Sequence, residues 1–495
     1  MNFSEYVQHD ALGLAALVQR REVSAAELLE AALQRCAEVN PKINALTIPM
    51  TAQARARSSE SVSGPFAGVP FLIKDIGQHY AGVPTTQGSR ATREHAPAEH
   101  AEVTRRFLAA GVTIFGKTST PELALKGVTE PARFGICRNP WNLDRTPGGS
   151  SGGAAAAVAA GIVPMAGASD GGGSIRIPAA CCGLFGLRPS RGRVPAGPTQ
   201  GEIWDGASSE HVLTRSVRDS AAMLDALQGA DVGAPFVIAP PHEPYRDAMQ
   251  RAPGRLRIGY TTRSPIGTPV DAECVAAIED TARLLRDLGH SVDAAEPQID
   301  GMQLARAYLH MYFGQTAATL AQIRAQTGAS ASEFELETRV LALLGDSLSA
   351  GEYVAWRGQW NDFARALGRY FQSWDLYLTP VLATPPIAVG GQLPAWQRLA
   401  LKPLLAMGAS LGVGALLRRS GLVEEMAVDS LRHVPFTQLS NLTGTPSMSV
   451  PLHWTQDGLP LGTQFIAPFG REDRLLQLAA QLEQARPWFD KRAPL

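Results

Sequence analysis

The most constraining feature of this chain lies between residues 148 and 178, where two serines sit in separate glycine-rich runs (GGSSGGAAAAVAAGIVPMAGASDGGGSIRIP). The alanine-rich segment 152–161 predicts a helix, because alanine is the strongest helix former. The apolar segment 162–168 predicts a strand that ends where the next glycines force a turn. Such a helix advances the chain by roughly 15 Å, and such a strand returns it by roughly 20 Å. We therefore expect Ser150 and Ser174 to face each other in a candidate active site.

Composition indicates a large apolar core and argues against a nucleic-acid partner. The chain has 495 residues, of which 45 % are hydrophobic and 18 % charged, and its formal net charge is −1. Because no basic run stands out, we expect no dedicated nucleic-acid surface. The five cysteines form no C-x-x-C pair, and the N-terminus lacks the basic and apolar regions of a signal peptide. Both features favour a reducing, cytoplasmic location.

Segments with helical periodicity alternate with short apolar runs along much of the chain. Residues 10–60 predict two amphipathic helices, the first capped by Asp10 and the second by a capping box of Ser24 and Glu27. Short apolar runs predict strands at 69–73, 112–115, 256–260 and 375–380, and a final helix is expected at 472–485. This alternation indicates a mainly parallel or mixed sheet that is covered on both faces.

Ser174 is the candidate nucleophile. It follows three glycines, so four backbone N–H groups can point into one cavity, those of Gly171, Gly172, Gly173 and Ser174. Preorganised N–H groups of this kind form an oxyanion hole, which stabilises the negative charge that develops on a carbonyl oxygen. The alternative is an ordinary serine in a tight glycine turn, and the serine alone does not decide between the two.

A serine hydroxyl requires a nearby base, and Lys74 is the candidate. The ten histidines are scattered and form no recognisable catalytic motif. Lys74 ends an apolar run, where burial would lower the pKa of its amine towards neutrality. Ser150 can then bridge the two, accepting the proton of Ser174 and passing its own to Lys74. The alternatives are a lysine that extends from a strand end into solvent and a serine that caps the following helix.

One glycine motif matches the formula of a P-loop but lies in a different structural context. Residues 111–118 (GVTIFGKT) match the formula of a phosphate-binding P-loop, G-x-x-x-x-G-K-[ST]. In a P-loop the strand precedes the glycine loop, whereas here the apolar β-branched residues lie inside the match. We therefore expect no nucleotide site and assign Lys117 to support of the site or the fold. No H-E-x-x-H motif and no clustered Cys/His spacing occurs, so neither a metal nor a cofactor is expected.

Several longer motifs, taken in order, resemble those of the amidase signature family. They are GPFAGVPFLIKD (64–75), FGKTSTPEL (115–123), RNPWN (138–142), TPGGSSGG (146–153), DGGGSIRIPA (170–179), CGLFGLRPSRGRV (182–194) and NLTGTPSMSVP (441–451). The resemblance covers nearly the whole chain. It implies a single α/β/α domain, residues 1–495, around a mixed, mostly parallel twisted sheet. Its expected parts are N-terminal helices (1–60), the signature core (61–233), a substrate-pocket region (255–432) and C-terminal strands with a helix (433–495).

The resemblance also implies a Ser–cis-Ser–Lys triad. Ser174 would attack an amide carbonyl, Ser150 would relay the proton after a cis peptide bond, and Lys74 would be the general base. An acyl-enzyme would form and be hydrolysed by water. Supporting positions around the triad are matched by Asp170, Arg176 and Ser151. One departure is Gly171, which stands where many members carry a bulkier residue, and it predicts a more mobile loop.

The substrate pocket is less well defined by the sequence. Candidate lining residues are Thr129, Cys137, Tyr308 and Tyr312. The last two belong to an aromatic cluster at 308–313 for which core packing is the equal alternative. The apolar segment Leu399–Leu417 has one charge, and it predicts packed helices, a lid over the substrate entrance or a contact with a membrane or partner. No stable membrane insertion is expected.

The predicted function is hydrolysis of a small-molecule carboxylic amide, with a bulky or apolar aryl, acyl, or cyclic or linear oligoamide group. A first alternative is the amidase subunit of a tRNA-dependent amidotransferase, because that subunit shares the triad. A second alternative keeps the mechanism and changes the substrate to an ester or a carbamate (urethane). The oligomeric state stays open, a homodimer included.

Overall fold

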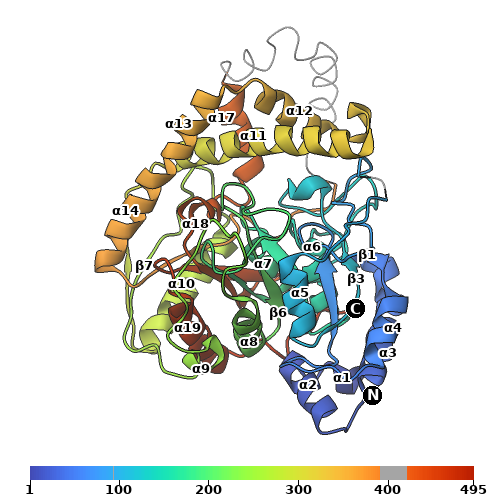
Figure 1. Ribbon diagram of the computed structural model, residues 1–495. Coiled ribbons are helices and arrows are strands. Elements are labelled where there is room, and N and C mark those ends of the chain that lie inside the picture. Colours follow the sequence, from blue (N-terminus) through green and yellow to red (C-terminus); the bar gives the residue numbers. More distant parts are fainter. Residues whose placement is uncertain (93, 391–420) are drawn as a thin grey trace.

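The short apolar runs of the sequence assemble into one sheet in the computed structural model, which describes residues 1–92, 94–390 and 421–495 (Figure 1). Its eleven strands lie in the order β1-β3-β2-β4-β6-β5-β10-β11-β9-β7-β8. The strands are β1 (Leu46–Pro49), β2 (Pro70–Lys74), β3 (Thr113–Thr118), β4 (Met165–Asp170), β5 (Phe185–Arg188), β6 (Ser209–Thr214), β7 (Arg257–Tyr260), β8 (Ser291–Ala294), β9 (Leu376–Pro380), β10 (Ser447–Trp454) and β11 (Pro460–Ile466).

Helices surround this sheet. They are α1 (Phe3–Tyr6), α2 (Ala11–Gln19), α3 (Ala25–Ile43), α4 (Thr51–Ser58), α5 (Glu102–Ala109), α6 (Gly152–Ala159), α7 (Arg176–Cys182), α8 (Val217–Leu227), α9 (Tyr245–Ala248), α10 (Ala272–Asp287), α11 (Gly301–Thr327), α12 (Leu336–Asp346), α13 (Ala350–Gly358), α14 (Trp360–Ser373), α17 (Leu422–Leu431), α18 (Gln438–Thr443) and α19 (Glu472–Ala485). The described 3₁₀ turns are η1 (Glu122–Ala124) and η2 (Ala331–Glu333). The α/β fold with a mixed sheet is confirmed.

The expectation of a mostly parallel sheet is wrong. Four strand pairings are parallel, β2–β3, β2–β4, β7–β8 and β7–β9. Six are antiparallel, β1–β3, β4–β6, β5–β6, β5–β10, β10–β11 and β9–β11. Part of the reason is local, because β10 and β11 form a hairpin closed by a tight turn at Gly458. The rest is long-range, since β6 inserts between β4 and β5 and runs opposite to both.

Local sequence signals place most elements where they were expected. Asp10 accepts a hydrogen bond from Gly13 at the start of α2, and Ser24 and Glu27 form the expected capping box of α3. The alanine-rich segment forms α6, and β4 follows it. The P-loop-like residues 111–118 contain strand β3, as expected if this motif is not a phosphate-binding loop. There Lys117 is buried, and its Nζ donates to Thr85 Oγ1 at 2.6 Å.

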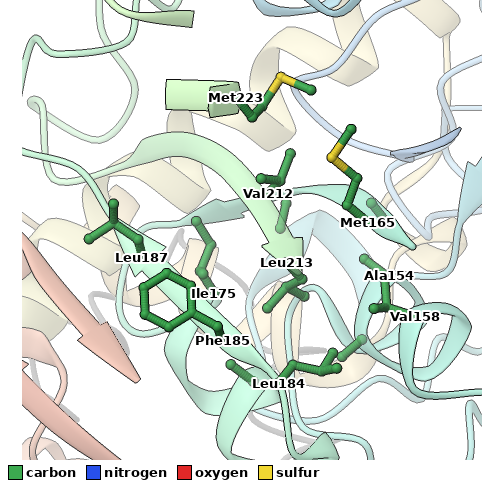
Figure 2. Packing of buried hydrophobic residues seen from close by; sticks show 14 of the residues in the cluster. Ala154, Val158, Met165, Ile175, Leu184, Phe185, Leu187, Val212, Leu213 and Met223 are labelled. Carbon is green, nitrogen blue, oxygen red and sulfur yellow. The ribbon is translucent and has the colours of Figure 1, made fainter. Parts of the chain in front are cut away.

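The main core lies on both faces of the central strands. Strands β2, β3, β4, β5 and β6 are buried along their whole length, which requires helices on both sides. In Figure 2, Leu213 of β6 lies on the side of Ala154 and Val158 of α6, whereas Val212 lies on the side of Met223 of α8. The small side chains of α6 let it lie close against the sheet, which fixes the loop that precedes it.

A second core joins a group of helices that we call the cap: α11, α12, α13, α14, α17 and α18. Figure 1 shows α11, α12, α13 and α17 as a band along the top of the molecule. Apolar side chains of α11, α12, α14, α17 and α18 form this core, and Trp204 and Tyr312 pack against it. The cap therefore extends to the loops of the candidate site.

The apolar segment Leu399–Leu417 lies outside the described residues. Within the described ranges, no helix combines the length and apolar character that a bilayer crossing needs.

Candidate active site

Lys74 and Ser150 meet in the interior of the protein. Lys74 ends β2 and has no exposed surface, and Ser150 is 1 % exposed. The Lys74 Nζ lies 2.7 Å from Ser150 Oγ and 3.0 Å from Ser169 Oγ. A lysine reaching into solvent is thus excluded. The amine instead faces the hydroxyls of Ser150 and Ser169, and it can accept a proton from Ser150.

Burial sets the proton affinity of Lys74. Removal of the amine from water lowers the pKa of Lys74 from 10.5 to about 7, against the opposing effect of the negative charges of Glu210 and Asp170. A lysine amine with a pKa near neutrality is substantially unprotonated at physiological pH, and the unprotonated form accepts a proton.

Ser150 lies in the glycine-rich loop before α6. The peptide bond between Gly149 and Ser150 is cis. The N-cap of α6 is Ser151, without a side-chain capping bond, so the capping alternative for Ser150 does not hold. The Ser151 Oγ instead donates to Ser169 O at 3.2 Å and accepts from Ser169 N at 3.3 Å. This pair of bonds joins the loop to β4.

The second glycine run is organised by Asp170, the last residue of β4. Its carboxylate accepts from the N–H groups of Gly173 at 2.7 Å and Ile175 at 3.1 Å. The Asp170 carboxylate therefore folds the loop back on itself and presents Ser174 at the start of α7. Ser174 itself is half-buried, in contrast to its fully buried neighbours.

Arg176 anchors this loop to the C-terminal part of the chain. Its guanidinium forms a buried ion pair with Asp170 at 2.9 Å and donates to Thr437 O, Gln464 Oε1 and Asn441 Oδ1. Burial opposes ionisation, but the charge and hydrogen bonds of Arg176 hold the pKa of Asp170 well below its usual range. The pair thus stays charged and fixes the loop in one geometry.

The expected oxyanion hole needs one correction. The Gly173 N–H is occupied by Asp170, so it is not available to a ligand. The N–H groups of Gly171, Gly172 and Ser174 have no acceptor in the part of the chain that the structure describes. The Gly172 carbonyl accepts from Thr437 Oγ1 at 2.7 Å and Gln438 Nε2 at 3.1 Å, which fixes the orientation of that peptide. Three N–H groups therefore remain for a developing oxyanion.

The Ser174 hydroxyl makes no hydrogen bond to any described residue. Lys74 and Ser150 are joined directly, whereas the link from Ser150 to Ser174 is not made in this structure. The structure thus shows the Lys74–Ser150 contact of the expected relay. It places Ser174, the candidate nucleophile, in the neighbouring loop without a hydrogen bond to Ser150.

Aromatic side chains cover the glycine loop. A Cβ built on Gly171 would lie 2.6 Å from the ring of Trp204, and one on Gly172 would collide with the Tyr308 hydroxyl. Tyr312 packs against both rings, 4.8 Å from Trp204 and 5.1 Å from Tyr308 between centroids. Gly171 is therefore explained by close packing under an indole ring rather than by loop mobility. We call Trp204, Tyr308 and Tyr312 the aromatic wall.

The backbone that carries Trp204 is held in an unusual conformation. Trp204 and Asp205 both have positive φ angles, 55° and 53°, which non-glycine residues seldom adopt. The Asp205 carboxylate accepts from Tyr353 Oη of α13 at 2.6 Å and from Gln315 Nε2 of α11 at 3.4 Å. The cap therefore fixes the turn that places the indole ring over Gly171.

Two of the predicted pocket residues lie elsewhere. Thr129 and Cys137 have no exposed surface. The Thr129 hydroxyl donates to Gly148 O at 2.9 Å, and Cys137 belongs to the main core. Thr129 thus supports the loop of Ser150, and Cys137 is a packing residue.

The sequence interpretation missed several residues of this site. They are Ser169, Thr437, Gln438, Asn441 and Gln464, together with Gln78 and Glu210, which are described below. Ser169 has a simple signal, since it precedes Asp170 on the strand that enters the loop. Gln78 lies four residues after Lys74, and Asn441 opens the motif 441–451, but neither was assigned a role; the others come from segments distant from the triad. Among the described residues, no group of three or more His, Cys, Asp or Glu side chains could hold a metal ion.

These features define a class of enzyme. A buried amine against one serine, beside a second serine in a loop of free N–H groups, suits nucleophilic attack on a carbonyl. Such a site on a large mixed sheet is that of a serine-dependent acyl-transfer hydrolase.

Comparison with known proteins identifies the family. The amidase family model matches residues 27–476. The chain is 38 % identical over 500 residues to 6-aminohexanoate-cyclic-dimer hydrolase of Pseudomonas sp. (strain NK87), covering 98 % of this chain and 96 % of that protein. The protein therefore belongs to the amidase signature family and is a hydrolase of carbon–nitrogen bonds other than peptide bonds.

Solved structures agree with this assignment. A structure of 6-aminohexanoate cyclic dimer hydrolase superposes with a TM-score of 0.88 at 35 % identity, covering 99 % of each chain. A bacterial aryl acylamidase of the amidase signature family superposes with a TM-score of 0.83 at 26 % identity, covering 98 % of this chain and 99 % of that chain.

Proposed function

We propose that Ser174 is the nucleophile of this amidase, Ser150 the proton relay and Lys74 the general base. The observation that carries the proposal is the 2.7 Å contact between the buried Lys74 amine and Ser150, beside a loop with free N–H groups. Burial supplies the unprotonated amine, since it lowers the pKa of Lys74 to about 7.

The steps follow from these positions. The Ser174 Oγ bonds to the amide carbon while its proton passes to Ser150 and the Ser150 proton passes to Lys74. The carbonyl oxygen becomes an oxyanion that accepts from the N–H groups of Gly171, Gly172 and Ser174. The C–N bond then breaks, and the proton returns through Ser150 to the leaving nitrogen. Water hydrolyses the resulting ester through the same relay and regenerates Ser174.

The link between Ser150 and Ser174 forms when substrate occupies the site. The Ser174 hydroxyl has no competing bond in the described part of the chain, so its rotation towards Ser150 breaks no existing interaction. Catalytic hydrogen bonds commonly tighten only in the substrate complex.

The substrate we propose is an amide with a bulky, apolar acyl or aryl group. The aromatic wall supports this, because the Trp204 ring lies beside Gly171 and Tyr308 beside Gly172, while Tyr312 packs against both of these rings. The similar proteins named above, a cyclic-dimer hydrolase and an aryl acylamidase, point the same way. The five cysteines are all free and buried, which supports the proposed cytoplasmic location.

Replacing Trp204 by alanine tests this substrate class. The wild type is assayed on an acyl anilide, a linear and a cyclic oligoamide, a small aliphatic amide, glutamine, an ester and a carbamate. We expect Trp204→Ala to lower kcat/KM for the bulky apolar amides by roughly 10- to 100-fold, because it removes apolar contact worth 1–3 kcal/mol. Turnover of the small aliphatic amide should fall much less.

Trp374→Ala is the matched control. Trp374 follows α14 and stacks on Tyr370, so its loss removes a similar ring without touching the aromatic wall. An equal loss on all amides in Trp204→Ala, or the same selectivity change in Trp374→Ala, contradicts the proposal. Turnover of glutamine alone would instead favour the amidotransferase subunit.

A further inference from the structure

Glu210 is a buried carboxylate beside Lys74 that the mechanism above does not use. It lies on β6, is 4 % exposed and stands directly opposite Ser169 of β4 in the antiparallel register. Directly opposed residues of an antiparallel pair project from the same face of the sheet. The Ser169 hydroxyl is 3.0 Å from Lys74 Nζ, so Glu210 lies on the Lys74 side of the sheet.

Gln78 holds this carboxylate in place. Its Nε2 donates to Glu210 Oε2 at 2.7 Å and to Ala168 O at 3.3 Å. Its Oε1 accepts from the backbone N–H of Lys74 at 2.8 Å. One fully buried amide side chain therefore bonds to both Lys74 and Glu210. Gln78 therefore ties the Glu210 carboxylate to the backbone of Lys74.

Two glycines provide the space for this arrangement. A Cβ on Gly167, in the middle of β4, would collide with the Gln78 amide. A Cβ on Gly77 would lie 2.8 Å from Glu210 Oε1, and Gly77 also has a positive φ of 76°. A side chain at either position would displace the Gln78–Glu210 pair. The lack of side chains at Gly77 and Gly167 therefore leaves the space that the Gln78 and Glu210 side chains occupy.

The other charged groups near Lys74 are already neutralised or turned away. Asp170 is paired with Arg176, and Arg188 of β5 lies near that pair. Asp75, next to Lys74, accepts from Thr86 and lies near Lys117, and His211, next to Glu210, contacts Ser220. Glu210 forms no ion pair with a described residue. It is the carboxylate left to balance a charge on Lys74.

We propose that Glu210, held by Gln78, is a positioning residue that supplies the counter-charge for the Lys74 ammonium formed during acylation. The inference rests on the proposed function. Glu210 exchanges no proton with the substrate and makes no covalent bond; its negative charge stabilises the protonated amine while the tetrahedral intermediate exists.

The electrostatics agree with this role. Burial raises the pKa of Glu210 to about 7, whereas the Gln78 hydrogen bond and the Lys74 charge lower it. Burial lowers the pKa of Lys74, and the Glu210 charge raises it. The pair therefore titrates as one unit around neutrality. Loss of the carboxylate leaves the amine with a still lower pKa.

The test is the pH dependence of kcat/KM for the Glu210→Gln enzyme, compared with that of the wild type. Its neutral amide can still accept from Gln78 but carries no charge. We expect the acidic limb of kcat/KM to move to lower pH by about one unit, because the uncompensated amine loses its proton more readily. We expect kcat/KM above the limb to fall roughly 10-fold. The labelling rate of Ser174 by a fluorophosphonate, measured against pH, should show the same shift without depending on product release.

Gln78→Leu provides a second variant. It removes the bond that lowers the pKa of Glu210, so it should move the acidic limb in the same direction. Glu483→Gln is the control, because Glu483 is a half-buried carboxylate whose pKa burial also raises to about 7, and it accepts from the Val217 N–H instead. It should leave the limb where it is in the wild type.

An unshifted limb in both folded variants, or an equal loss of activity at every pH, overturns the inference. Its failure differs from failure of the proposed function. If Lys74→Met abolishes the limb while Glu210→Gln leaves it unchanged, only the role of Glu210 is wrong. If Lys74→Met retains the limb, the base assignment itself is wrong.

Discussion

Ser174→Ala is expected to lower kcat by about 10⁴-fold or more on every amide that the wild type hydrolyses, because it removes the only nucleophile of the mechanism. The melting temperature should stay within a degree or two of the wild type, roughly the scale of a surface substitution. The side chain is half-buried, and its hydroxyl bonds to no described residue, so folding loses little with it. Initial rates and a thermal melt on the same preparation check both statements.

Ser447→Ala is a suitable control for this variant. Ser447 is a fully buried serine of β10 whose hydroxyl has no hydrogen-bond partner among the described residues. Its replacement should retain near wild-type turnover. Substantial hydrolysis by a folded Ser174→Ala protein would mean that another group attacks the amide.

Lys74→Met is expected to lower kcat/KM by roughly 10³- to 10⁴-fold, because the relay then ends without a base. In the wild type, kcat/KM should rise with pH through about 7, as the Lys74 amine loses its proton and becomes able to accept one. That limb should vanish in Lys74→Met. The measurement is the pH profile of kcat/KM for both enzymes on one amide.

Lys74→Met should also be at least as stable as the wild type near neutral pH. The folded-state pKa of Lys74 is about 7, below the ordinary value of 10.5, so between these values the unfolded chain binds a proton that the folded chain releases. The wild type is therefore penalised most at and below pH 7, and the penalty disappears towards pH 10. The gain in melting temperature for Lys74→Met should follow the same pH dependence.

Lys117→Met separates the loss of the Lys74 base from the loss of any other buried lysine. Burial lowers the pKa of Lys117 to about 8, and its amine bonds to Thr85 rather than to a site serine. By the same linkage its stability should rise near neutral pH, and by less than in Lys74→Met, because burial lowers the pKa of Lys117 only to about 8. The acidic limb near pH 7 should stay. Loss of that limb in Lys117→Met would contradict the assignment of the base.

The sequence predicted those parts of the site that depend on local signals. The glycine runs place Ser150 and Ser174, the apolar run ending in Lys74 predicts a buried amine, and Asp170 follows directly from its strand. Helix caps at Asp10 and Ser24 were equally predictable, because capping is decided within a few residues.

The remaining features depend on contacts between distant segments. The share of parallel pairings was overestimated, because the alternation of helices and strands along the sequence does not show which strands become neighbours in the sheet. The Gly173 N–H was counted as an oxyanion donor, although only the folded loop shows that Asp170 takes it. Glu210 is 132 residues from Gln78, and nothing in the local sequence predicts their bond. Gly171 looked like a source of mobility until Trp204 filled the space beside it.

The most direct test of the account is the covalent intermediate. The enzyme is mixed with an aryl carbamate or ester that acylates it quickly and is hydrolysed slowly, and intact mass is followed by peptide mapping. The account predicts one added acyl group per chain, carried by Ser174, formed faster as pH rises through about 7 and absent from Ser174→Ala and Lys74→Met. An acyl group on any other residue, or full turnover with no adduct at Ser174, would contradict it.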